Sequence, residues 1–170
     1  MSAKEELEKL ALACEECAGK DDASLDEHLA TCPVCVDHNK KAEEIHQMLE
    51  VMQMMASKPE EERHKILAAR MEQFSTMPDD KRKDAISDML DSLEELSEED
   101  RLKVIKTRTD ILTKLPKDKR NILMGTLKEA MSGWTQDRKM MEKRAVMAAT
   151  QDYFIMKRMM VRMMFKKMMA

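Results

Sequence analysis

A 19-residue spacing of helix-start signals constrains the fold of this chain more than any other feature. Four residues that favour the start of a helix stand at that interval: Pro59, Pro78, Ser97 and Pro116. Four positions further on, each unit carries an arginine: Arg63, Arg82, Arg101 and Arg120. A later apolar position also recurs, at Phe74, Leu93, Leu112 and Met131. Nineteen residues accommodate one helix of about four turns and a short connection. The repeat therefore predicts four consecutive helices.

The composition agrees with a helical chain. Charged residues make up 37% of the sequence and aromatic residues 3%, with three glycines and four prolines in 170 residues. One amphipathic helix cannot bury its apolar stripe alone, so the units must stack on one another, as in a bundle or a solenoid. We predict an all-α fold with four parts: a zinc-binding module (1–41), a Met-rich linking helix (42–58), the four-unit repeat (59–135) and one basic, amphipathic, Met-rich helix (136–170).

The N-terminal part contains all four cysteines of the chain, which form two C-x2-C pairs: Cys14 and Cys17, then Cys32 and Cys35. Two such pairs are a common way to offer four thiolate ligands to tetrahedral zinc. We therefore predict zinc as the cofactor, bound by these four cysteines. His28 precedes Cys32 by one helical turn and is an alternative ligand in place of Cys14 or Cys17. A thiol redox sensor that releases zinc on oxidation is a second hypothesis for the same cysteines.

The string His28-Leu-Ala-Thr-Cys32-Pro-Val-Cys35 resembles the signature of the zinc-binding anti-sigma family and related zinc-finger domains. The resemblance covers about residues 4–45. It implies that His28, Cys32 and Cys35 are zinc ligands, with Cys14 or Cys17 as the fourth. It also implies a regulatory domain that holds a sigma factor or responds to thiol oxidation.

The C-terminal part differs from the rest in charge and in methionine content. Residues 138–170 hold nine basic and two acidic side chains, a balance of +7, whereas residues 1–137 hold 21 basic and 31 acidic ones, a balance of −10. Ten of the 20 methionines lie between Met140 and Met169. Such a helix can pack on the repeat, bind an apolar helix of a partner, or adsorb to an anionic membrane surface. The candidate contact residues are Met156, Arg158, Met159, Met160, Arg162, Met163, Met164 and Lys166.

These observations favour a binding protein over an enzyme. The sequence has no Gly-rich phosphate loop and no known nucleophile or metalloprotease motif. The first residues do not resemble a secretory signal, and free thiols fit a reducing, cytoplasmic location, with peripheral binding at a membrane as an alternative. We expect a non-enzymatic, zinc-binding adaptor or regulatory protein that binds a protein partner through its repeat and tail. A helper for apolar helices is the further alternative. The few aromatic residues of the tail disfavour nucleic acid as a partner.

Overall fold

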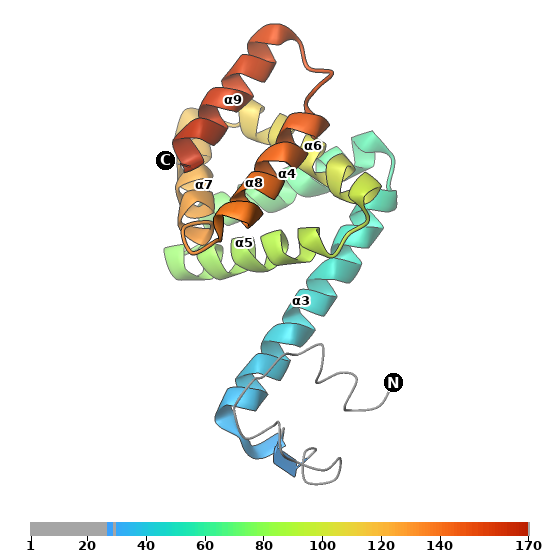
Figure 1. Cartoon of the computed structure of the whole chain (residues 1–170). Helices are drawn as coiled ribbons and strands as arrows, with labels where there is room; N and C mark the ends of the chain where they lie inside the picture. Colours follow the sequence, from blue (N-terminus) through green and yellow to red (C-terminus); the bar gives the residue numbers. More distant parts are fainter. Residues whose placement is uncertain (1–26, 29, 170) are drawn as a thin grey trace. The chain divides into compact units, whose positions relative to one another are not determined.

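The computed structural model describes residues 27–28 and 30–169, and all regular secondary structure within them is helical (Figure 1). The predicted all-α class is therefore confirmed. The chain divides into two compact units, Met1–Gln47 and Met48–Ala170. Helix α3 (Pro33–Ser57) contributes residues to both units, and it includes most of the predicted linking helix. Its start at Pro33 fits the preference of proline for the first position of a helix.

Six helices begin at 19-residue intervals among the described residues of the second unit. They are α4 (Glu60–Thr76), α5 (Asp79–Glu94), α6 (Glu98–Lys114), α7 (Lys117–Ala130), α8 (Gln136–Ala149) and α9 (Ile155–Met169). We number each unit from its cap residue, position 0. In every unit the amide of position 4 then donates to the carbonyl of position 0. In the first unit Arg63 donates to Pro59 (2.9 Å), and in the last unit Arg158 donates to Phe154 (3.0 Å). The 19-residue spacing therefore extends over two more helices than the four predicted.

The structure differs from the prediction of one continuous helix over 136–170, because residues 150–154 separate α8 from α9. No glycine or proline causes this break. Tyr153 instead turns inward, and its hydroxyl donates to the carbonyl of Lys106 on α6 (3.1 Å). Asp152 accepts from Lys106 Nζ (2.6 Å) in the same place. Lys106 lies 46 residues from Asp152 and 47 residues from Tyr153 in the sequence. These long-range contacts override the helical preference of the local sequence.

The most extensive helix–helix contacts of the second unit join helices that are two units apart: α4 with α6, α5 with α7 and α6 with α8. An arginine at position 4 joins the two. Arg63 Nε donates to Thr107 Oγ1 (2.9 Å), and Arg82 Nε donates to Thr126 Oγ1 (2.8 Å). Both threonines stand at position 10 of their units, and both arginines are less than 9% exposed. Arg63 and Arg82 are therefore structural residues that fix one helix against another.

The same arginines also form hydrogen bonds to the connection that precedes their helix. Arg63 Nη1 donates to the carbonyl of Lys58 (2.8 Å), and Arg82 Nη1 donates to that of Met77 (2.7 Å). These carbonyls lie just beyond the end of the preceding helix, where backbone acceptors have no partner inside the helix. One arginine side chain thus donates hydrogen bonds both to a turn and to a neighbouring helix.

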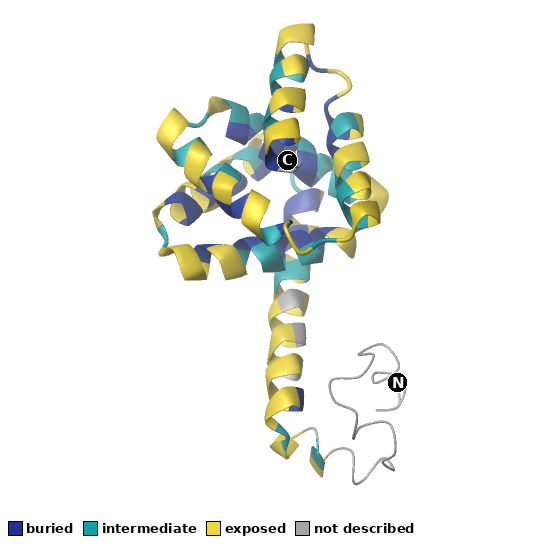
Figure 2. Cartoon of the chain, turned by 60° about the vertical axis from the view of Figure 1, so that its left-hand side comes forward, coloured by how far each residue is buried: buried dark blue, intermediate teal, exposed yellow. Residues whose placement is uncertain are grey.

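A second repeated contact links each helix to the third one along the chain. A carboxylate at position 13 pairs with a cation at position 3 in three successive cases: Glu72 with Lys119, Asp91 with Arg138 and Asp110 with Lys157. Each pair is separated by 47 residues, so the same ion pair recurs at three successive places in the second unit. Beneath these surface contacts lies a shared apolar core (Figure 2), which contains the predicted later position of each unit: Phe74, Leu93, Leu112 and Met131.

We expect Thr126→Val to destabilise the second unit by about 1–3 kcal/mol, because the buried Arg82 Nε would lose its acceptor while the side-chain shape is kept. Thermal and chemical unfolding would measure the change. Thr113→Val is the matched control, since the Thr113 hydroxyl bonds, within the part of the chain that the structure describes, only the nearby carbonyl of Asp110. Equal effects of the two substitutions would contradict the proposed role of the arginine bond.

The third arginine of the series provides the converse test. Arg101 Nε is buried without a hydrogen-bond partner among the described residues, and Ala145 stands where Thr107 and Thr126 stand in their units. We expect Ala145→Thr to give a protein more stable than Ala145→Val by about 1–2 kcal/mol, since only threonine supplies an acceptor. Unfolding midpoints of the two variants would decide this. Equal stability would show that the residue at position 10 does not reach Arg101.

Candidate functional site

Three potential metal ligands lie together at the start of α3. One ligand atom from each of His28, Cys32 and Cys35 falls within 4.8 Å of the other two. His28 and Cys32 are half-buried, and Cys35 is fully buried. Imidazole nitrogen and thiolate sulfur are the ligands that zinc prefers in structural sites.

The local backbone explains why these side chains meet. The amide of Cys32 donates to the carbonyl of His28 (2.8 Å), which places the two residues one helical turn apart. Pro33 then opens α3, so that Cys32 directly precedes this helix and Cys35 stands in its first turn. Because the N-terminal end of a helix carries partial positive charge, it favours the negative charge of a bound thiolate.

The size of the cluster is close to that of a zinc site. Ligands at about 2.0–2.3 Å from a tetrahedral zinc ion lie roughly 3.3–3.8 Å from one another. The three atoms therefore need to approach by at most about 1.5 Å, which small rotations of the side chains provide. Of the predicted ligands, Cys32 and Cys35 lie together and His28 joins them. Cys14 and Cys17 lie outside the described residues, so the all-cysteine site stays a prediction.

The methionine-rich tail is divided between two faces of α9. Met164 lines the interior together with Phe165 and Met168, and Met160 and Arg158 are half-buried. The remaining predicted contact residues are exposed: Met156, Met159, Arg162, Met163 and Lys166. Phe154 and Ile155, which were not among the predicted contact residues, are 77% and 65% exposed at the start of this helix. The extended 19-residue spacing is the signal that could have identified them as outward positions.

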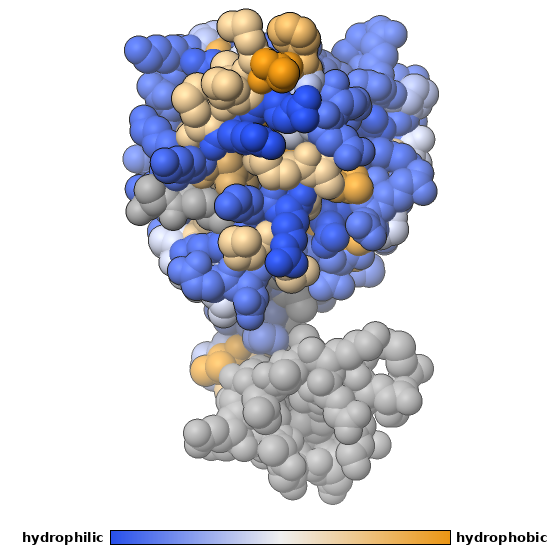
Figure 3. All heavy atoms as spheres, turned by 45° about the horizontal axis from the view of Figure 1, so that its top comes forward, coloured by the Kyte–Doolittle hydropathy of each residue, from blue (hydrophilic) through white to orange (hydrophobic). Residues whose placement is uncertain are grey.

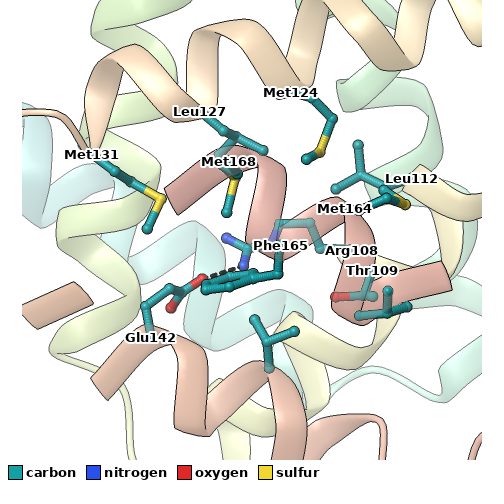
Figure 4. Close-up of a pocket in the computed structure, with 12 residues that line it drawn as sticks. Arg108, Thr109, Leu112, Met124, Leu127, Met131, Glu142, Met164, Phe165 and Met168 are labelled. Carbon is teal, nitrogen blue, oxygen red and sulfur yellow. Dashed lines mark hydrogen bonds and ion pairs between the residues drawn. The ribbon is translucent and has the colours of Figure 1, made fainter. Parts of the chain in front are cut away.

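A small cavity lies between α6, α7, α8 and α9 (Figure 4). Its walls are mainly Met and Leu side chains, and the Arg108–Glu142 ion pair (2.5 Å) borders it. Its volume is about 30 Å³. Small-molecule sites usually have about 300–1,000 Å³, so this cavity is a packing defect of the core and not a ligand site.

Asp110 anchors α9 to α6. Its carboxylate accepts from Lys114 Nζ (2.6 Å) on its own helix and forms an ion pair with Lys157 of α9. Burial acts to raise the pKa of Asp110, but the hydrogen bonds from the two lysines outweigh it, and the pKa lies below its usual value. Lys157 Nζ also lies 3.9 Å from the centre of the Tyr153 ring. These contacts fix which face of α9 points outward.

None of the described helices is long and apolar enough to cross a membrane.

Residues 28–125 match the family described as "Protein of unknown function (DUF3106)". The match covers more than half of the chain and includes His28, Cys32 and Cys35. The expected relation to the zinc-binding anti-sigma and zinc-finger families is therefore wrong: the HLATCPVC string falls within this other family, and short Cys–His spacings recur in unrelated proteins. No curated protein and no solved structure matches the chain.

The geometry around Asp110 predicts a defined pH dependence. Asp110→Asn should lower the stability at pH 7 by about 1–2 kcal/mol, because two charge-assisted hydrogen bonds weaken. The folded-state pKa of this carboxyl is lowered, so its contribution is fully present above the ordinary value of about 4 and is lost as the pH falls through the lower, folded-state value. The difference between variant and parent should therefore vanish in acid, as followed by thermal unfolding against pH.

Glu129→Gln is the matched control for this prediction, since Glu129 occupies the same position in the next unit, is exposed and forms no ion pair among the described residues. A stability loss equal to that of Asp110→Asn would indicate a general charge effect. A loss that persists unchanged in acid would show that the Asp110 carboxylate does not supply the stabilisation.

Proposed function

We propose that this chain, which belongs to the DUF3106 family, is a non-enzymatic zinc-binding adaptor. The observation that carries the proposal is the convergence of His28, Cys32 and Cys35 within 4.8 Å. The fourth ligand comes from the upstream pair, Cys14 or Cys17. A zinc ion bound by four protein ligands has no open position for substrate or water and serves to hold chain segments together.

The role of an adaptor is supported by the rest of the chain. Acidic pairs such as Glu60–Glu61 and Glu98–Glu99 stand in the first turns of helices, where the helix dipole accounts for them without a catalytic role. The first turns of the helices expose charged side chains such as Glu60, Asp79 and Glu98, which suit recognition of a protein partner. Zinc in the first unit then orders the residues around the cysteines, and the second unit supplies the partner surface.

Zinc content is the first test. The protein purified without added metal should contain a single zinc ion by native mass spectrometry, and His28→Ala and Cys35→Ser should each lower the zinc affinity strongly. His38→Ala, an exposed histidine six residues beyond Cys32, is the control and should retain the metal. Binding of Co²⁺ reports the ligand set by absorption, since thiolate ligands give intense charge-transfer bands.

Two outcomes of this experiment would overturn parts of the proposal. A protein that neither contains nor binds zinc would refute the metal centre. Retention of full affinity in His28→Ala, with loss in Cys35→Ser, would refute the histidine ligand and leave the four cysteines. Release of zinc by mild peroxide, with formation of a disulfide, would favour the redox sensor over a purely structural site.

A further inference from the structure

We propose that the outer face of α9 docks on an anionic membrane surface. This face is defined by Phe154, Ile155, Met156, Met159, Met163, Arg162 and Lys166. The inference goes beyond the zinc-binding adaptor and rests on a different part of the chain. Phe154, Ile155 and Met156 of this face differ from the residues at the same positions of the five other helices.

Positions 1 and 2 of each unit point to solvent in all six helices. In α4, α5 and α6 they carry two acidic residues each, and in α7 and α8 one of the two is acidic: Glu60–Glu61, Asp79–Asp80, Glu98–Glu99, Asp118 and Asp137. Such residues are favourable near the positive end of the helix dipole. In α9 the same positions carry Ile155 and Met156, which are 65% and 73% exposed. The fold therefore does not account for apolar residues at these positions.

Exposed apolar residues also occur further along α9. Met159 and Met163 occupy positions 5 and 9 and are 59% and 62% exposed. Position 5 is apolar in α6 and α8 also, as Leu102 and Met140, whereas position 9 is a polar or small residue in all five other units. Ile155, Met159 and Met163 follow one another at intervals of four residues, so they form one stripe on the surface of the helix. Figure 3 shows that apolar side chains gather in a band on this side of the molecule, next to strongly hydrophilic ones. Clustered apolar surface of this kind marks an interaction site.

The positive charge of α9 indicates an anionic membrane as the partner of this face. Residues 154–170 contain five basic and no acidic side chains. Arg162, Lys166 and Lys167 are exposed and form no ion pair with the described residues. Cations beside exposed Met, Ile and Phe side chains fit the interface of an anionic bilayer, in which the apolar groups enter below the headgroups and the cations meet the lipid phosphates.

Other occupants fit this face less well. A second copy of the chain would bring two sets of unpaired cations together, and like charges at an interface are unfavourable. Nucleic acid would neutralise the cations and leave the apolar stripe in water. The shortness of α9, 15 residues, and the absence of any membrane-spanning helix among the described residues mean that the contact lies on the membrane surface.

Vesicle flotation with the full chain tests the inference. The protein should float with vesicles of phosphatidylcholine and phosphatidylglycerol, should not float with phosphatidylcholine alone, and should dissociate as the salt concentration rises. The double variant Met159→Gln/Met163→Gln should bind the vesicles more weakly by a factor of about ten or more, because two apolar side chains no longer enter the interface. Met54→Gln/Met141→Gln is the matched control, since these methionines are similarly exposed, 51% and 55%, on other helices.

A fluorescence reporter separates insertion from simple electrostatic adsorption. Because the parent protein already contains Trp134, the reporter is the emission of Met156→Trp after subtraction of the parent's emission. This difference should shift to the blue with anionic vesicles and stay unchanged with neutral ones. The inference is overturned if the parent protein does not float with anionic vesicles. It is also overturned if Met159→Gln/Met163→Gln floats like the parent while Arg162→Gln/Lys166→Gln does not, or if the methionine variant converts a dimer to a monomer.

The zinc site and the membrane face can fail independently. Cys35→Ser should leave vesicle binding unchanged, and Met159→Gln/Met163→Gln should leave the zinc content unchanged. Circular dichroism of each variant verifies that the helices remain. Met159 and Met163 are exposed, so their substitution does not alter the core.

Discussion

The second unit depends on the guanidinium groups of two buried arginines near the starts of α4 and α5. Arg63 and Arg82 each donate to a carbonyl that follows the preceding helix and to a threonine hydroxyl two helices further on. A planar group with five donors in a fixed arrangement can serve both acceptors at once, whereas a lysine ammonium could not keep this geometry. The angle of each turn and the position of the second neighbour are thereby set by one side chain. The apolar core then fills the space that these contacts define.

The sequence predicted the parts of this arrangement that depend on local signals. Proline or serine at position 0 and arginine at position 4 identified four helices, and the structure places a helix on each. The fifth and sixth units carry Thr135 and Lys139, then Phe154 and Arg158, at the same positions. These substitutions concealed the spacing, and the break before α9 depends on Tyr153 reaching α6, a contact across 47 residues. Local sequence cannot show such a contact.

The candidate metal centre was predictable to a similar extent. The H-x3-C-x2-C spacing is local, and a single helical turn followed by the start of α3 brings His28, Cys32 and Cys35 together. The four-cysteine set required a contact between residues far apart in the chain, which spacing alone does not determine. The relation to a known family was wrong because a few ligand residues constrain local geometry and carry little information about the surrounding protein. The methionines of the tail were predicted as one apolar face, whereas the packing of Phe165 and the anchoring of Lys157 divide them into two.

The pairing of each helix with the second and third helices along the chain has a consequence for cooperativity. In a simple stack, where only adjacent repeats touch, an end repeat can unfold without exposing much of the others. Here the loss of α6 would expose surfaces of α4, α8 and α9 together, because all three contact it. The second unit should therefore unfold in one transition. During synthesis, a helix completes its contacts only after the ribosome has added some 44–47 further residues, and until then its buried arginine remains accessible to solvent.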